Sequence, residues 1–330
     1  MRNVGSVILA FFPSFIHVNI RRLLGQKIGK GAKIKFGTLI LSRKIEIGAR
    51  SKIGPFAIVK SKDLRVGEDS IIKSLAFVIS RKIRIDSYVH IAPLCIIKGG
   101  FGMNSSFEIS DHSRIFPFCW IDCAEGVKIG NNVGIGGFSL LFTHGVWSNF
   151  VDGGPVSFKP IEIGNNVWLP WRVFILPGVK IGNNVIVGAN SLINKSIDDN
   201  SLTAGSPAKH IRYLEETNSE EKRARFIEIL NEYAKQLNFE HDSTNCVVEN
   251  HQLHFNDYNL SIDDCSGLKR GDLLVSLSVE SEDQMKELRN KEISIFDYST
   301  LTIHLNKPHK FTKEFVPFLR KFGVRLYENK

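Results

Sequence analysis

Aliphatic residues recur with a period of six along the first two-thirds of the chain. Eight aliphatic positions open the pattern, and each is followed six and twelve residues later by another aliphatic residue. The eight openers are Ile28, Ile47, Val66, Ile85, Ile109, Ile129, Ile163 and Ile181. An α-helix repeats its apolar face every 3.6 residues and a β-strand every second residue. A period of six therefore predicts neither a long helix nor a simple strand.

The period predicts a triangular prism built from short strands. One large side chain on each six-residue side points inward, and three sides complete one coil. Most openers lie 18–20 residues apart, which matches three sides, and successive coils are expected to pair as strands about 4.8 Å apart. Repeats of this kind form stacked architectures in which each unit contacts only its neighbours. The residues ten positions after the openers are compact enough to lie near the axis: Thr38, Ala57, Ala76, Cys95, Cys119, Ser139, Val173 and Ser191.

The repeat divides the chain into three parts. We expect residues 28–214 to form a prism of about eight coils, and residues 1–27 to form an apolar and basic cap segment. Residues 215–330 are expected to form a small α+β or α/β domain, in which no motif indicates a role. Helical spacing of Phe226, Ile229, Leu230, Tyr233 and Leu237 predicts one helix. We expect further helices over 282–289 and 313–322, and strands over 273–279 and 299–305.

Basic residues and two apolar runs are concentrated near the N-terminus. Residues 1–100 contain 19 Lys and Arg residues against 5 Asp and Glu residues. The runs Val4–Phe12 and Phe15–Ile20 are separated by Pro13, and each is too short to span a bilayer. Two interpretations remain open. The segment is a helix that caps the prism, or it is an amphipathic segment that rests on anionic lipid.

The five cysteines include no Cys-x-x-Cys pair, and Cys95 and Cys119 fall at the compact inward position. Buried free cysteines are typical of a reducing compartment. We therefore expect a cytoplasmic protein, with peripheral contact at the inner face of the membrane as the further possibility. We expect no nucleic-acid partner.

Three stretches resemble the closing coils of the hexapeptide-repeat acyltransferases. They are Ile161–Trp168, Ile175–Val179 and Ala204–Lys209. The resemblance covers about residues 28–212. It implies an all-β, left-handed parallel β-helix, and the handedness comes from the resemblance alone. It also implies acetyl-CoA as acyl donor, a homotrimer, and active sites between subunits.

Two coils are longer than the period requires, near residues 98–104 and over roughly 142–160. Long ordered loops are often functional. His144 stands at the entrance of the second loop, and imidazole can accept and return a proton near neutral pH. The resemblance implies that His144 is the general base. Asp122, one coil earlier, is expected to stack beneath Phe142 and either to orient the imidazole or to bind the acceptor.

The resemblance also implies where the two substrates bind. Trp168 matches a tryptophan beside the acceptor and pantetheine channel, and the backbone near Val173 and Ala189 is expected to line the donor path. Pro170 and Trp171 replace the small residues usual there. Basic side chains suit phosphate groups, so Lys209 and Arg212 are expected to bind the CoA phosphates. In and beside the loop, the expected acceptor contacts are Phe142, Trp147, Asn149 and Asp152.

The leading hypothesis is an acetyl-CoA-dependent O-acetyltransferase of bacterial surface polysaccharide or lipopolysaccharide synthesis, acting on a sugar hydroxyl. A second is N-acetylation of an amino nucleotide sugar. A hypothesis of another class is a non-catalytic β-helix scaffold. A metal-binding β-helix resembling γ-type carbonic anhydrase requires three converging histidines. The loop offers only His144, so we expect no metal.

Overall fold

The computed structural model describes residues 2–100, 102–146, 149–240, 246–250, 252–255, 258–277, 282–298, 300–306, 310–324 and 327–328. Trp147, an expected acceptor contact, lies outside the described residues. The chain forms two compact units, Met1–Glu215 and Glu216–Lys330.

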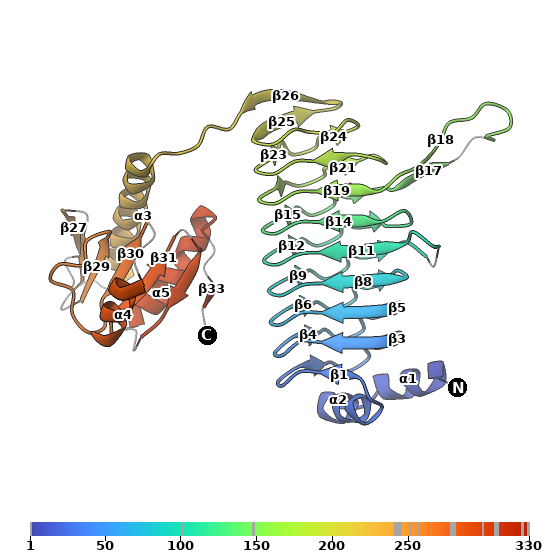
Figure 1. Ribbon diagram of the computed structural model, residues 1–330, viewed down its shortest axis with the longest axis horizontal. Helices are drawn as coiled ribbons and strands as arrows, with labels where there is room; N and C mark the ends of the chain where they lie inside the picture. Colours follow the sequence, from blue (N-terminus) through green and yellow to red (C-terminus); the bar gives the residue numbers. More distant parts are fainter. Residues whose placement is uncertain are drawn as a thin grey trace. The chain divides into compact units, whose positions relative to one another are not determined.

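Three strand ladders form the sides of the first unit (Figure 1). Wall 1 contains β1 (Lys27–Ile28), the second halves of β3 (Leu39–Ile47) and β5 (Ile58–Val66), then β8 (Lys82–Ile85), β11 (Ser106–Ile109), β14 (Val127–Ile129), β19 (Ile161–Ile163) and β22 (Lys180–Ile181). Wall 2 contains β2 (Lys33–Ile34), β4 (Lys52–Ile53), β6 (Ile71–Ile72), β9 (His90–Ile91), β12 (Arg114–Ile115), β15 (Gly134–Ile135), β20 (Trp168–Leu169), β23 (Ile186–Val187), β25 (Ser201–Gly205) and the antiparallel β26 (Ala208–Tyr213).

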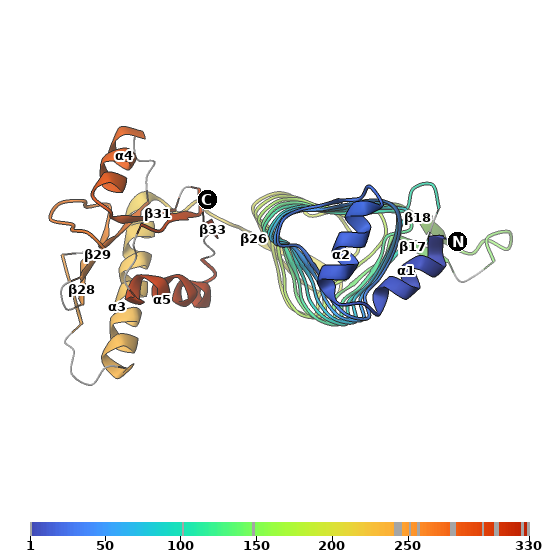
Figure 2. The ribbon, with the colours of Figure 1, turned by 90° about the horizontal axis from the view of Figure 1, so that it is seen from below.

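Wall 3 contains the first halves of β3 and β5, then β7 (Phe77–Ile79), β10 (Ile96–Lys98), β13 (Trp120–Asp122), β16 (Leu140–Leu141), β21 (Phe174–Ile175) and β24 (Leu192–Ile193). Within the three walls the strands pair in parallel up to β25. Seen along the axis, the coils superpose in a three-sided outline (Figure 2).

The period of six predicted the registers of this prism, and the structure confirms them. Ile28 pairs with Ile47, Ile34 with Ile53, and so on up the walls. All aliphatic residues of the pattern are at most 9% exposed, and most are fully buried. Dispersion and the removal of apolar surface from water both favour such a column, at about 25 cal/mol per Å² buried.

Two features of the walls were not predicted. First, β3 and β5 run without interruption from wall 3 into wall 1, whereas β7 ends at Ile79 and β8 begins at Lys82 in the next coil. Second, a further inward column precedes the openers by two residues, as the strand period of two requires. Its members are Ile45, Leu64, Ile83, Phe107, Val127, Ile161 and Val179.

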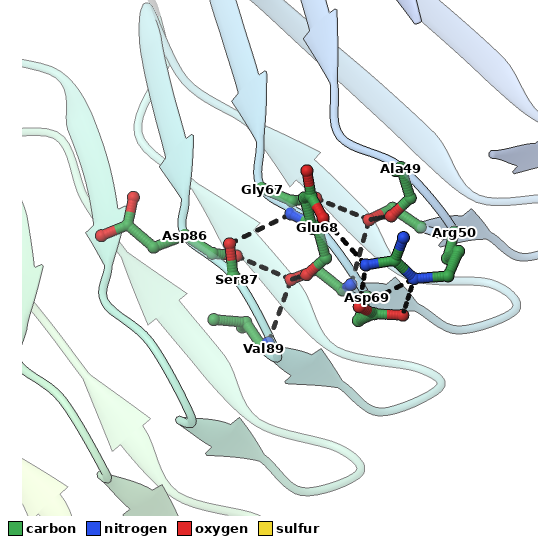
Figure 3. Close-up of polar contacts among 10 residues, drawn as sticks. Ala49, Arg50, Gly67, Glu68, Asp69, Asp86, Ser87 and Val89 are labelled. Atoms are coloured by element: carbon green, nitrogen blue, oxygen red, sulfur yellow. Dashed lines mark hydrogen bonds and ion pairs between the residues drawn. The ribbon is translucent and has the colours of Figure 1, made fainter. Parts of the chain in front are cut away.

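Polar contacts between coils hold the corners at the end of wall 1. Arg50 donates to Asp69 from Nε at 2.8 Å and from Nη2 at 2.6 Å, and Nη2 also donates to Glu68 at 2.8 Å (Figure 3). In later coils the same corner holds Asn132, Asn166, Asn184 and Asn200, whose φ angles are 53–55°. Asparagine tolerates this left-handed conformation, and the side-chain amides bond from coil to coil at 2.9–3.0 Å.

The outward faces of the walls differ in chemistry. The residue before each wall 1 opener is charged: Lys27, Glu46, Arg65, Arg84, Glu108, Lys128, Glu162 and Lys180. The residue before each inward residue of wall 3 is apolar: Leu39, Ile58, Phe77, Ile96, Trp120, Leu140, Phe174 and Leu192. Since strand residues alternate between faces, wall 1 presents a row of charges to water and wall 3 presents a continuous row of apolar side chains.

Two helices lie at the N-terminal end of the prism, α1 (Arg2–Ala10) and α2 (Ser14–Leu23), with Pro13 between them. Helix α2 crosses the end of the prism (Figures 1 and 2) and buries His17, Val18 and Arg21 against it. Of the two interpretations of the N-terminal segment, the cap is therefore observed. In the described part of the chain, no helix is long and apolar enough to cross a membrane.

The second unit contains a seven-stranded sheet in the order β27 (Val247–Glu249), β28 (Gln252–Phe255), β29 (Tyr258–Ile262), β30 (Leu273–Ser276), β31 (Ser294–Asp297), β32 (Thr302–His304) and β33 (Tyr327–Glu328). Its other elements are α3 (Ser219–Glu240), α4 (Glu282–Asn290), α5 (Lys310–Leu319) and the 3₁₀-helix η1 (Arg320–Phe322). Helices α3 and α5 share one apolar cluster with the sheet, and α4 shares another.

The expected helices of this unit correspond to α3, α4, and α5 with η1. The two expected strands are shorter than predicted, since β30 ends at Ser276 and β32 spans only Thr302–His304. Residues 278–279 and 299 lie outside the described residues. The remaining strands were not predicted.

Candidate active site

His144 and Asp122 form a hydrogen-bonded pair where the long loop leaves wall 3. His144 opens β17 (His144–Val146), which pairs antiparallel with β18 (Val156–Phe158) to form a hairpin that projects from the prism (Figure 1). Asp122 ends β13, one coil below. His144 Nδ1 lies 2.7 Å from Asp122 Oδ2. The stacking registers thus bring together two residues that are 22 positions apart in sequence.

Thr143 fixes the carboxylate of this pair. Its backbone N–H donates to Asp122 Oδ2 at 3.0 Å, and its hydroxyl donates to the same oxygen at 2.6 Å. Both residues are buried. The Thr143 hydroxyl oxygen also accepts from the N–H of Glu125 at 3.1 Å. Asp122 Oδ2 therefore receives three donors, and its position is set by the backbone of the next coil.

The contacts define the proton positions on the imidazole. An ionised carboxylate only accepts hydrogen bonds, so Nδ1 of His144 carries the proton that bonds to Asp122. Neutral imidazole then has its lone pair on Nε2. The His144 side chain is 43% exposed, while that of Asp122 is 8% exposed. This arrangement presents a proton acceptor to solvent and holds a negative charge behind it, where it stabilises the imidazolium formed when a proton is taken.

Aromatic rings flank the pair. The ring of Phe158, on the returning strand of the hairpin, is nearly parallel to His144 with centroids 6.1 Å apart. Phe142 packs edge-on against Phe174 at 5.6 Å. Phe142 precedes His144 by two residues and is half-buried, and its expected contact with the acceptor stays a prediction. Aromatic faces are common surfaces for apolar sides of ligands.

Trp168 lies on a different wall from His144. It stands on wall 2 above Gly134, where an added Cβ would come within 2.5 Å of the indole, and it packs edge-on against Phe116 at 6.0 Å. Trp171 packs over Gly137 and beside Phe138, with ring centroids 6.0 Å apart. The bulk at residue 171 is thus accommodated by a glycine in the coil below.

The expected donor-binding residues divide into two groups. Ala189, Lys209 and Arg212 are exposed, the last two on β26. Val173 is fully buried, its N–H donates to Ser139, and its carbonyl accepts from Leu140. Within one chain, the side chain of Val173 therefore belongs to the core and its backbone groups are paired, and the donor contact near this residue stays a prediction.

Asn149 and Asp152 occupy the tip of the hairpin rather than its base. Asn149 Nδ2 donates to Asp152 Oδ2 at 2.6 Å, and Asn149 Oδ1 accepts from the N–H of Val151. The antiparallel pairing of His144 with Phe158 places His144 at the base of the hairpin. Within one chain, the structure does not bring these two polar residues to the imidazole.

Sequence reasoning missed Thr143, Lys98 and Trp120. Thr143 bonds Asp122 directly. Lys98 lies in register with Asp122 one coil below, and the exposed Trp120 is on the same strand as Asp122. The coil register could have predicted that Lys98 stacks on Asp122, because each follows the inward aliphatic residue of its strand by one position. Among the described residues, no cluster of three or more His, Cys, Asp or Glu side chains is arranged to hold a metal ion.

Comparison with known proteins places this chain among acetyltransferases. The family described as "Bacterial transferase hexapeptide (six repeats)" matches residues 160–195. The "Putative lipopolysaccharide biosynthesis O-acetyl transferase WbbJ" of Escherichia coli K12 is 36% identical over 135 residues, which cover 37% of this chain and 68% of the relative. The galactoside O-acetyltransferase of the same strain is 42% identical over 90 residues, which cover 27% of this chain and 44% of the relative. The chain thus matches less than half the length of that second enzyme.

Among solved structures, the hexapeptide-repeat acetyltransferase VCA0836 of Vibrio cholerae O1 biovar eltor, complexed with acetyl-coenzyme A, aligns with 55% of this chain and 73% of its own at 20% identity. The TM-score of that alignment is 0.28.

Proposed function

Since this chain belongs to the hexapeptide-repeat acyltransferases, whose fold is the left-handed parallel β-helix, we propose that it transfers an acetyl group from acetyl-CoA to a sugar hydroxyl. The observation that carries the proposal is the pair formed by Asp122 and His144, with Nε2 of the imidazole free of the carboxylate and facing solvent.

In this mechanism His144 acts as the general base. Its Nε2 takes the proton of the acceptor hydroxyl while the oxygen attacks the thioester carbonyl, and it returns that proton to the departing thiolate. The acetyl ester and free CoA result, so His144 is regenerated. Asp122 holds the imidazole in the required tautomer and stabilises its charged form, and Thr143 holds Asp122. Such a base contributes about 10²–10⁴ in rate.

The donor is proposed to bind near Trp168 and Ala189, with its phosphates at Lys209 and Arg212. These residues supply an aromatic surface, exposed backbone and two cations. Acetyl-CoA contributes only the activated acyl group to the reaction. The chain's part is to hold it and to deprotonate the acceptor.

We also propose that the enzyme is a homotrimer. One outward row of wall 3, from Leu39 to Leu192, is apolar along its whole length, although Lys60 and Lys98 lie in the row beside it. A continuous apolar row of this kind is typical of a protein interface. The hairpin carries Asn149 and Asp152 away from the prism that contains their own His144, while Trp168 stands on another wall. A site assembled from two chains brings such residues together, and C3 closure leaves no unpaired interface.

The acceptor is proposed to be a glycan of the bacterial surface, met in the cytoplasm or at the inner face of the membrane. The names of the two relatives, which refer to lipopolysaccharide synthesis and to galactosides, support a sugar.

The test is release of CoA from acetyl-CoA in the presence of nucleotide sugars and lipid-linked glycans. For the acceptor that this panel identifies, His144→Ala should lower turnover by about 10²–10⁴ and leave the melting temperature nearly unchanged. His254→Ala in the second unit is the matched control and should retain full activity. Turnover of His144→Ala within a factor of three of wild type would rule out the base, and a panel without any active acceptor would count against sugar acetylation.

A further inference from the structure

The N-terminal end of the prism has an apolar outer surface. Helix α2 directs His17, Val18 and Arg21 into the prism. At 100° per residue, Phe15 and Leu23 lie on the opposite side of the helix, so they point away from the prism along its axis. Phe15 is 68% exposed and Leu23 is 87% exposed, and Leu24 follows at 67%. Phe11 and Phe12, which precede the helix, are also exposed, but Phe11 packs edge-on against Phe36 of the first coil, with ring centroids 5.9 Å apart, and is not counted in this surface.

The charge around this surface has one sign. The chain contains nine Lys and Arg residues before Glu46 and no Asp or Glu. Apart from Arg21, which is buried, they include the exposed residues Arg22, Lys27, Lys30, Lys33 and Lys35 on α2 and the first coil. Aromatic and aliphatic side chains surrounded by lysine and arginine match the interface of a bilayer that contains anionic lipid. Contact with water alone would not favour exposed Phe15, Leu23 and Leu24 at this end.

Hydrogen bonds join helix α2 rigidly to the first coil of the prism. Arg21 donates to His17 at 2.8 Å, to Gln26 at 3.1 Å and to the backbone carbonyl of Ile40 at 3.1 Å. Arg22 donates to the carbonyls of Ile28 and Gly29. These contacts join the helix to the first coil, so a surface that binds α2 also fixes the direction of the prism.

We propose that this end is a membrane-binding face, on which the enzyme stands upright with the prism axis along the normal of an anionic bilayer. Along wall 3, β16 lies five coil spacings, or about 24 Å, from β3 in the first coil, and His144 follows β16. The imidazole therefore stands about this far above the first coil. Taken together with the proposed sugar acetylation, this height defines a class of acceptor. The acetylated sugar belongs to a lipid-linked glycan and lies several sugar units from its lipid, whereas the lipid-proximal sugar is out of reach.

Sedimentation with vesicles tests the face itself. The protein should bind phosphatidylcholine vesicles that contain phosphatidylglycerol, bind pure phosphatidylcholine weakly, and lose binding at high salt. Phe15→Ser with Leu23→Ser should abolish retention, while Ile211→Ser with Tyr213→Ser, exposed at the other end of the prism, should preserve it. Each unit of charge near the surface contributes about fivefold in affinity, so Lys30→Glu should weaken binding roughly 20-fold and the matched Lys195→Glu should not.

Tryptophan fluorescence tests the upright orientation. All four tryptophans lie between residues 120 and 171, and those that the structure describes stand at least four coil spacings, about 19 Å, from the first coil. In a Trp147→Phe background, brominated lipid should therefore leave the emission of the remaining three tryptophans unchanged although the protein is bound, and should quench the added emission of Phe15→Trp. Quenching of the native tryptophans would show that the prism lies on its side and would overturn the height argument.

The outcomes separate this inference from the proposed activity. Acetyl transfer to soluble glycans without binding to phosphatidylglycerol vesicles would overturn the membrane face and leave the enzyme intact. Vesicle binding without transfer to any sugar would overturn the proposed acetyl transfer and leave the membrane-binding face supported. If Phe15→Ser with Leu23→Ser lowers the sedimenting mass of a protein that never binds vesicles, the apolar end is covered by a second copy of the chain, and the proposal is wrong.

Discussion

Replacement of Asp122 by asparagine tests the geometry of the catalytic pair more finely than removal of the histidine. One oxygen, Oδ2, accepts from the Thr143 N–H, from the Thr143 hydroxyl and from His144 Nδ1. The backbone N–H is a fixed donor, so Asp122→Asn must place its amide oxygen at this point. All three hydrogen bonds then persist, the imidazole keeps its proton on Nδ1, and only the negative charge is lost.

The magnitude follows from the hydrogen bond to His144. A hydrogen bond to a charged group contributes about 1.5–3 kcal/mol and one between neutral groups about 0.5–1.5 kcal/mol. Losing the charge therefore costs about 1–1.5 kcal/mol in the transition state, or roughly tenfold in turnover. Asp122→Ala also leaves the buried Thr143 N–H without its acceptor. It should approach the loss of His144→Ala and lower the free energy of unfolding by about 1–3 kcal/mol.

Two measurements check the reasoning. Turnover by CoA release should rank wild type, Asp122→Asn and Asp122→Ala in that order. Two-bond ¹H–¹⁵N spectra of the histidine rings report the tautomer of His144 without any acceptor, and Asp122→Asn should retain the proton on Nδ1. An Asp122→Asn enzyme as impaired as His144→Ala, with the proton on Nε2, would refute the single-oxygen geometry.

Two further predictions concern the donor and the cap. Lys209→Glu should weaken CoA more than dephospho-CoA if this side chain meets the 3′-phosphate, and calorimetry that finds equal weakening would contradict the contact. Burial, and secondly the charge of Arg21, lower the pKa of His17 from 6.5 to about 4. The unfolded chain then binds more protons between these values, so cap stability should fall by up to about 3 kcal/mol as pH drops from 6.5 to 4 and stay constant above 6.5. Hydrogen exchange of α2 measures this, and His17→Asn should remove the pH dependence.

The prism was predictable because each coil repeats the same physical constraint. Every inward position must hold an apolar residue of similar size, as Ile34, Ile53 and Ile72 do, so the period survives in the sequence. The second unit has no such repetition. Its strand β31 (Ser294–Asp297) buries Ile295 against the nearby α4 and Phe296 in the apolar cluster that contains α3 and α5. Its apolar residues alone did not distinguish a strand from a loop.

The candidate site was predictable only where the coil register extends to it. Counting coils placed Asp122 beside the start of the loop, and the structure bonds it to His144. Thr143 was missed because its role depends on backbone direction at the edge of wall 3, which side-chain periodicity does not encode. Val173 was assigned to the donor because of its place in a motif, although its position ten residues after an opener already indicated the core.

The hairpin of β17 and β18 is an insertion that does not disturb the pairing of the coils before and after it. Strands β14 and β19 pair in register as neighbouring coils although their openers are 34 residues apart in sequence. The part of the hairpin beyond His144 is therefore free to change in length and composition without a shift in any coil, because surface insertions cost little free energy. His144 and Asp122 remain fixed by the walls while the tip with Asn149 and Asp152 varies. Acceptor preference and proton transfer can thus diverge independently within one scaffold.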